Sequence, residues 1–297
     1  CGTAKTTPNI KDVAAEWPRP WVWSRVLLAF LATLALLYTL LTTFGNPNGF
    51  PGVMFIGALA VPFSVLIFFY ETNIPRNISL VNTVTIFFIG GAASLVALYL
   101  LPSDLLQASG TADFGPAMIT GLIEEIAKVA IIVVVFNLRE HDKDDAPRTN
   151  YVLNGLLIGA AVGAGFAVFE TAGYIFRVWM LSGINGMTNV LILRAVLAIG
   201  GHVVWAAAEG AALALAEGDN GYSNSQLFNP RFLIVFALCV ILHGVWDMSI
   251  PFLDTGILAS FEFKYILLIV AVWIIIAVLL KRGLDQVNQL ANDSQDH

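Results

Sequence analysis

Residues 155–170 read GLLIGAAVGAGFAVFE, a run of small and apolar residues that ends in a glutamate. Gly155, Gly159 and Gly163 recur every fourth residue, so in a helix they form one stripe along which a second helix approaches closely. Glu170 follows Gly163 by seven positions and lies on the same face. The pattern predicts a buried helix whose glycines serve packing and whose glutamate points toward neighbouring helices.

The composition around this stretch indicates a membrane protein. Of 297 residues, 58% are hydrophobic and 12% charged, and the mean hydropathy is +0.78, whereas about a quarter of the residues of a soluble domain are charged. The net charge of -6 includes no basic block, so we expect no nucleic-acid partner. Cys1 and Cys239 are too few for a disulfide framework and have no metal-binding spacing.

Eight stretches approach the roughly 20 apolar residues that a helix needs to cross a bilayer. We therefore predict an all-α fold, a polytopic bundle of about eight transmembrane helices. The predicted spans are 21–44, 52–70, 80–101, 116–137, 152–176, 190–214, 232–251 and 265–280. Short polar or turn-rich segments separate the spans, which leaves no room for a soluble domain.

The chain divides into four predicted parts. They are a cytoplasmic N-terminal arm 1–20, a three-span segment 21–115, a catalytic core of four spans 116–251, and a final span with a cytoplasmic tail 252–297. We interpret Cys1 as a numbering boundary rather than as a lipidated N-terminus, because lipidation would place the basic arm outside.

Lysine and arginine are in excess in cytoplasmic loops. With the N-terminus inside, only Arg177, Arg194 and Lys264 fall on the outer side. The inner side receives Lys5, Lys11, Arg19, Arg25, Arg76, Arg139, Lys143, Arg148, Arg231, Lys281 and Arg282. This asymmetry predicts that both termini are cytoplasmic.

Span 116–137 contains charged residues within the hydrocarbon, where each costs at least about 2.5–3.5 kcal/mol. The segment reads Glu124-Glu125-x-x-Lys128. We expect Lys128 to pair with Glu124, four residues away on one face, and Glu125 to point about 100° away and remain free for chemistry. The alternative is a packing salt bridge between spans.

The next spans add histidines and acids. His202 lies in span 190–214 with Glu209 two turns deeper, and His243 and Asp247 lie one turn apart in span 232–251. A single buried histidine is usually a hydrogen-bonded structural residue. Polar residues in four consecutive spans favour a functional site instead.

Depth supports that interpretation. At 1.5 Å per residue, four side chains lie roughly 9–18 Å below the outer boundary of the membrane. They are Glu124, Glu170, His202 and His243. A reaction centre requires such convergence, whereas unrelated structural residues do not. Asp247 would lie nearer the outer mouth and Lys128 deeper.

Taken in their order along the chain, four short motifs in these spans resemble those of the PrsW intramembrane proteases, relatives of the type II CAAX prenyl endopeptidases. The resemblance covers residues 116–250. The motifs are Glu124-Glu125-x-x-Lys128, Phe166-x-x-x-Glu170, His202 and His243-x-x-Trp246-Asp247. CAAX endopeptidases have histidine in the second motif and often asparagine in the fourth. Glu170 and Asp247 therefore favour the PrsW branch and argue against prenyl-protein processing.

The resemblance implies an integral protein of the bacterial cell membrane that hydrolyses a peptide bond of a membrane-tethered protein. In the family, this is cleavage of an anti-sigma factor near its extracytoplasmic side. Glu124 or Glu125 would be the general base and His243 would orient water or stabilise the oxyanion. Asp247 would set the His243 tautomer or close the mouth of the site. Lys128, His202 and Glu170 would complete the catalytic group.

The sequence leaves open whether a metal ion takes part in the reaction. His202, His243 and Glu170 form a plausible three-ligand site for a divalent metal such as zinc (Zn). The same residues would also serve a glutamate-driven mechanism, and we favour a metal-free or metal-optional one.

Two other classes of function remain. One is a non-catalytic membrane scaffold of the same fold that binds partner membrane proteins within the lipid bilayer. The other is a transporter or proton relay built on Glu124, Glu170 and His202, for which the expected internal repeat is missing. Motifs of other intramembrane proteases, such as His-Glu-x-x-His or Gly-x-Ser-Gly, do not occur. The scaffold is the better alternative.

Overall fold

The computed structural model describes residues 20–100, 113–141, 151–217, 223–250, 253–255 and 261–293. In this part of the chain every regular element is a helix, apart from an isolated bridge between Asp254 and Glu262. The all-α prediction is confirmed. Cys1 and nearly all of the predicted arm 1–20 lie outside the described residues.

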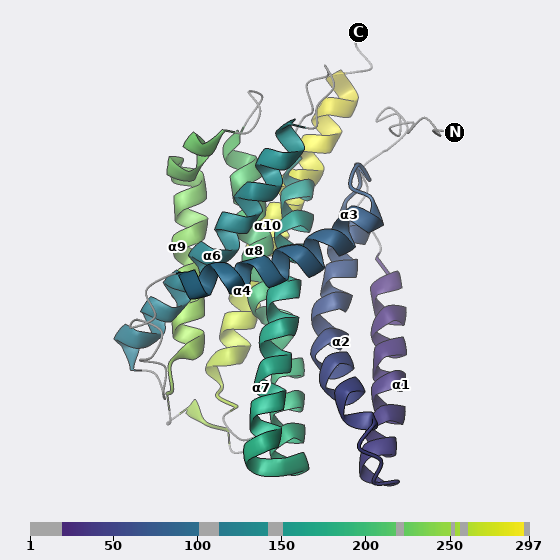
Figure 1. The fold of residues 1–297 in the computed structure, drawn as a ribbon. Helices are drawn as coiled ribbons and strands as arrows, with labels where there is room; N and C mark the ends of the chain where they lie inside the picture. The colour runs from purple at the N-terminus through teal and green to yellow at the C-terminus, as the bar shows by residue number, and fades with distance from the viewer. Residues whose placement is uncertain are drawn as a thin grey trace, which may run out of the picture.

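Most residues of the predicted spans are helical (Figure 1). The α-helices are α1 (Val22–Thr42), α2 (Gly49–Thr72), α3 (Leu80–Thr85), α4 (Gly91–Leu100), α6 (Phe114–His141), α7 (Val152–Leu197), α8 (His202–Glu217), α9 (Pro230–Asp247) and α10 (Lys264–Asp293). A π-helical turn, Ile86–Gly90, joins α3 to α4, and 3-10 turns occupy Ala198–Gly200 and Asn224–Phe228.

Within the described residues, six segments are long and apolar enough to cross a membrane. The difference from eight has two causes. Helix α6 carries Glu124, Glu125 and Lys128 near its middle, which reduces its apolarity. The stretch Val152–Ala216 forms one segment of 65 residues, although two separate spans were expected there.

Helix α7 reverses direction at Gly183. A straight helix of 46 residues would be about 69 Å long, more than twice the roughly 30 Å of a hydrocarbon core. Gly183 has a φ of 66°, in the left-handed region that glycine adopts without strain. The chain runs to one end of the bundle and returns (Figure 1). The turn brings the second half of α7 back toward the polar residues of the first half.

The glycine stripe of α7 packs directly on the backbone of α8. A Cβ atom at Gly155, Gly159 or Gly163 would lie 1.9–2.3 Å from a carbonyl oxygen of α8. Residues 152–168 are all buried, which makes this half of α7 the central helix of the bundle. The predicted packing role of the glycines is therefore confirmed, and the carbonyl opposite Gly163 belongs to His202.

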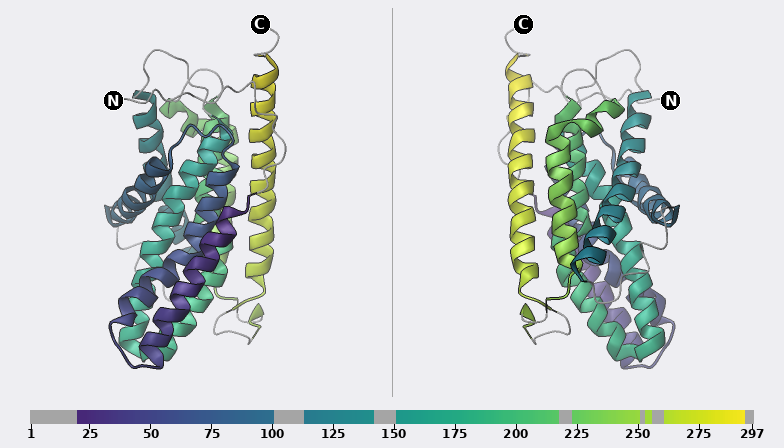
Figure 2. Two further views of the ribbon diagram at one scale, coloured as in Figure 1. Left: turned by 90° about the vertical axis from the view of Figure 1, so that its right-hand side faces the viewer. Right: turned by 90° about the vertical axis from the view of Figure 1, so that its left-hand side faces the viewer.

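A second close contact joins α6 to α9. A Cβ atom on Gly121 would lie 3.0 Å from the backbone nitrogen of Gly244. Because Gly121 precedes the two acids of α6 by one turn and Gly244 follows His243, this contact brings the acids and the imidazole together. Helix α10 runs along one flank of the bundle (Figure 2), and α1 begins toward the same end at which α10 finishes (Figure 1).

The α7–α8 contact predicts a large difference between two glycine substitutions. In Gly159→Ala, the new methyl group would lie 1.9 Å from the carbonyl oxygen of Ala206, so the helices must separate, at a cost of about 1–3 kcal/mol. Gly115→Ala is the matched control, since nothing lies within 4 Å of a Cβ there. We expect a lower unfolding midpoint in detergent for Gly159→Ala alone. Equal midpoints would contradict the packing described.

Candidate active site

A cavity of about 620 Å³ opens between α4, α6, α7, α8 and α9. Its wall is apolar on the α4 side, where Leu95 and Leu98 lie, and polar on the other. The polar lining includes Glu124, Glu170, His202, His243 and Asp247. The structure thus brings into one pocket the four side chains that were expected to share a depth. A volume of this size suits a peptide segment or another small ligand.

Lys128 and Glu125 form a fully buried ion pair behind the cavity. The Nζ atom of Lys128 lies 2.7 Å from Oε1 of Glu125, and both side chains are 0% exposed. The predicted pairing of Lys128 with Glu124 is wrong. Residues three apart share a helix face as well as residues four apart do, and here Glu125 faces the interior while Glu124 lines the cavity. Glu124, not Glu125, is the acid that does not pair with Lys128.

His243 is positioned by Glu125. Its Nδ1 atom lies 2.6 Å from Oε1 of Glu125, which also accepts from Lys128 and is therefore an ionised acceptor. Nδ1 donates this hydrogen bond. The Nε2 atom is directed at the cavity, 3.5 Å from Oε2 of Glu124 and 3.4 Å from Oδ2 of Asp247. The Trp205 ring stacks on the imidazole with centroids 4.6 Å apart, which fixes the plane of the ring.

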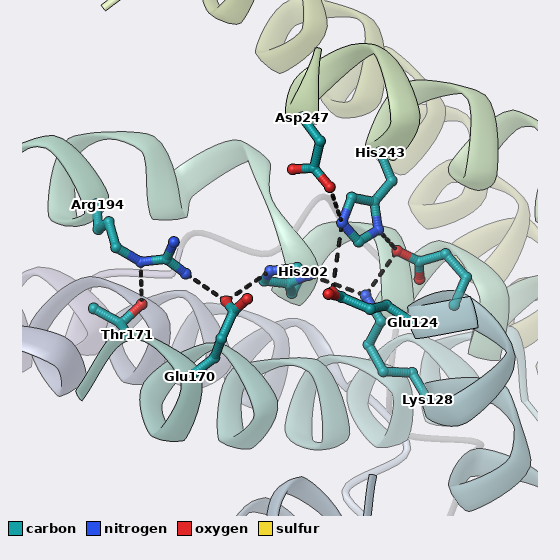
Figure 3. Close-up of polar contacts among 9 residues, drawn as sticks. Glu124, Lys128, Glu170, Thr171, Arg194, His202, His243 and Asp247 are labelled. Atoms are coloured by element: carbon teal, nitrogen blue, oxygen red, sulfur yellow. Dashed lines mark hydrogen bonds and ion pairs between the residues drawn. The ribbon is translucent and has the colours of Figure 1, made fainter. Parts of the chain in front are cut away.

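His202 is the first residue of α8. The predicted span 190–214 is broken just before it, because Gly201 is not helical (φ −100°, ψ −142°). The break places the imidazole between Lys128 and Glu170: Nδ1 lies 3.0 Å from Nζ of Lys128, and Nε2 lies 3.2 Å from Oε2 of Glu170. His202 therefore connects Lys128 of α6 with Glu170 of α7 (Figure 3).

Arg194 is a site residue that the sequence analysis placed only by its side of the membrane. It lies in the returning half of α7, where its Nη2 donates to Glu170 Oε2 and its Nε donates to Thr171 Oγ1 at 2.9 Å (Figure 3). The guanidinium also lies over the Tyr174 ring, 4.5 Å from its centroid. An arginine within an otherwise apolar segment was the signal available in the sequence. Its effect is to neutralise and orient Glu170.

Three side chains are placed to hold a metal ion. Glu124, His202 and His243 each offer one ligand atom, and these atoms lie within 4.8 Å of one another. Two imidazoles and a carboxylate are a usual ligand set of catalytic zinc. Oε2 of Glu124 is buried and has no hydrogen-bond donor among the described residues, so it is available either to a cation or to a proton. Glu170 was expected as the carboxylate ligand, but its oxygen is engaged by Arg194.

Carboxylate and imidazole side chains gathered in a buried cavity of a helical membrane protein are the groups that hydrolysis within the membrane requires. A family model described as PrsW family intramembrane metalloprotease matches residues 80–279, about two-thirds of the chain. The chain therefore belongs to the PrsW family of intramembrane metalloproteases. Neither the curated proteins nor the solved structures contain a match.

Membership of this family confirms the resemblance seen in the motifs. The match begins at the third predicted span and ends in the last, so it extends beyond residues 116–250 on both sides. The family is one of metalloproteases, and the buried Glu-His-His group fits a metal. The family description therefore supports the divalent metal considered from the sequence over a metal-free mechanism.

The buried pair predicts a non-additive pair of substitutions. Lys128→Met leaves Glu125 as a buried charge without its cation, and we expect a loss of about 3–5 kcal/mol in unfolding free energy. Glu125→Leu should have a comparable effect. The double variant removes both charges and should lose clearly less than the sum. A double-mutant cycle on unfolding in detergent measures this, and strict additivity would argue against the pair.

Proposed function

We propose that this chain cuts a peptide bond of a membrane-tethered protein near the extracytoplasmic side, and that Glu124 is the general base. The observation that carries the proposal is the environment of Glu124. Its side chain lines the cavity, and its buried Oε2 lacks a hydrogen-bond donor among the described residues. A carboxylate that accepts no hydrogen bond is a strong proton acceptor. Peptide hydrolysis needs such a group beside the attacking water.

The neighbouring residues have separable roles in this proposal. Glu124 takes a proton from water and returns it to the leaving amine. His243, fixed through Nδ1 by Glu125, presents Nε2 to the cavity, where it would hold the metal ion next to that water. Asp247 lies 3.4 Å from that Nε2 and is 32% exposed at the mouth, where it keeps the ring directed at the cavity. Glu125, Lys128 and Arg194 act as positioning residues.

Glu124, His202 and His243 would hold the metal. A divalent cation such as zinc polarises the scissile carbonyl and acidifies a bound water. Glu124 has two carboxylate oxygens, so one would remain to accept the proton. Glu170, held by Arg194, would hold the His202 ring through Nε2, as outer carboxylates do for metal-binding histidines.

For the topology we propose eight passages through the membrane with both termini in the cytoplasm. Six segments meet the criteria of length and apolarity; the two further passages are α6, which carries the catalytic acids, and the returning half of α7 with α8. The even number agrees with α1 beginning toward the end of the bundle at which α10 finishes (Figure 1). Residues 116–251 would form the catalytic core, and an anti-sigma factor in a bacterial membrane is the substrate that the family suggests.

Cleavage of co-expressed single-span proteins tests the proposed function. Glu124→Gln and His243→Ala should lower cleavage at least about 100-fold, since a general base contributes about 10²–10⁴-fold. Asp285→Asn is the matched acid-to-amide control, because Asp285 pairs with Lys281 on the exposed end of α10. The proposal fails if a substrate is cut equally by all variants. Partners that co-purify without being cut would favour a scaffold.

Metal binding provides a second test. We expect purified protein to bind about one zinc ion per chain and to lose cleavage with a chelator and regain it with zinc. Glu124→Ala should weaken zinc affinity more than Glu170→Ala, because only Glu124 belongs to the group of ligand atoms. Equilibrium competition with a zinc dye measures this. A larger loss in Glu170→Ala would restore the ligand set expected from the sequence.

A further inference from the structure

Arg177 lies on the wall of the cavity, and its charge is not paired with an acid of the described residues. It is the first residue after the predicted span 152–176, its side chain is exposed, and it lines the cavity together with Arg194. Arg194 is occupied, because it donates to Glu170 and Thr171. No described carboxylate forms an ion pair with Arg177. Its charge is therefore available to a ligand in the cavity.

The Tyr174 ring holds the Arg177 guanidinium against the cavity wall. The Cζ atom of Arg177 lies 5.5 Å from the centroid of this ring, and the Cζ atom of Arg194 lies 4.5 Å from the same centroid. An aromatic ring attracts a cation, but this contact leaves the N–H donors of a guanidinium free to bond elsewhere. Arg177 thus combines a supported position with unused hydrogen-bond donors.

Helix geometry places Arg177 at a defined distance from the reactive group. Glu170, Tyr174 and Arg177 follow one another at four and three positions, so they share one face of α7. Glu170 contacts Nε2 of His202 at 3.2 Å, and Arg177 lies about 10 Å farther along the helix. An extended peptide covers about 3.3–3.6 Å per residue. A substrate residue about three positions from the scissile bond would therefore lie beside Arg177.

The chemistry of the site favours a carboxylate on the substrate. A guanidinium matches a carboxylate with two parallel hydrogen bonds, and Glu124 disfavours a second acid at the reactive group itself. A lipid phosphate is the other anion available at a membrane boundary. It would occupy the cavity that the substrate has to enter, so the substrate is the better source of the negative charge.

We propose that Arg177 is a specificity-determining residue that binds the side-chain carboxylate of an aspartate or glutamate of the substrate. This acid would lie about three residues from the scissile bond, on its extracytoplasmic side. Its contact with Arg177 fixes which peptide bond reaches Glu124 and His243. The inference rests on the proposed function, because it specifies a feature of the protein that is cut.

Charge reversal on both partners tests this subsite. A single-span protein that is cut is prepared with Asp, Asn or Lys at each of the positions about two to five residues outside the cut site. At one position, the wild type should show a KM about 3- to 10-fold lower for Asp than for Lys. The kcat should be unchanged, since Arg177 lies away from the reacting atoms. Arg177→Gln should abolish the preference, and Arg177→Glu should reverse it.

Arg231→Glu is the matched control, because Arg231 is also exposed but lies at the start of α9 and does not line the cavity. It should keep the wild-type preference for Asp. An unchanged preference in Arg177→Glu, or the same change in Arg231→Glu, would overturn the proposal. The source of the anion is tested in phosphatidylcholine vesicles with and without phosphatidylglycerol. If Arg177→Glu alters cleavage only with phosphatidylglycerol, and equally for all three substrate forms, the ligand is a lipid phosphate and the proposal is wrong.

Peptide binding gives a readout that needs no cleavage. Fluorescent single-span peptides with Asp or Lys in the same outer segment are titrated with the Glu124→Gln variant in detergent, and anisotropy reports their affinity. The Asp peptides should bind about 3- to 10-fold more tightly, and adding Arg177→Glu should reverse the order. If the order reverses but the wild type cuts no single-span protein, the Arg177 subsite stands and the proposed protease function fails. If proteins are cut but neither KM nor binding responds to the reversal, only the subsite fails.

Discussion

The structure depends on the charge of Lys128 inside an apolar bundle. The Nζ atom contacts Glu125 on its own helix and His202 on α8, and it lies 5.2 Å from the Phe166 ring centroid on α7 and 5.6 Å from that of Trp205 on α8. A lysine exposed to lipid would be strongly unfavourable. The helices that enclose it must therefore pack closely, and Glu125 and His202 contact this charge directly.

Close helix contacts make that convergence geometrically possible. Glycines at 155, 159 and 163 let α7 touch the backbone of α8, and Gly121 does the same between α6 and α9. In lipid, burial of apolar surface gives little preference for one helix partner over another, so van der Waals contact between small residues selects partners. The polar residues determine which helix faces turn toward one another, and the glycines allow the helices to approach closely. Neither alone would bring Nε2 of His243 to 3.5 Å from Glu124.

Local periodicity explains how much the sequence could predict. The helices, the packing role of the glycine stripe, and the common face of His243 and Asp247 follow from helix geometry alone. Helix geometry did not predict the partner of Lys128. Residues three and four positions apart are both neighbours on a helix, and tertiary packing decides between Glu124 and Glu125. The break at Gly201 and the pairing of Arg194 with Glu170 also depend on contacts between distant segments, which a single sequence does not reveal.

The four glutamates of this region differ in their hydrogen-bond partners. Glu125 is held by Lys128 and His243, and Glu170 is held by Arg194 and His202. Each of these acids is stabilised by a partner and is therefore a poor proton acceptor. Glu124 alone of the four combines a place on the cavity wall with a buried oxygen that has no described donor. Because Glu125 and Glu170 are held by their partners, Glu124 is the acid on the cavity wall whose unmet hydrogen-bonding capacity a water molecule or a metal ion would satisfy.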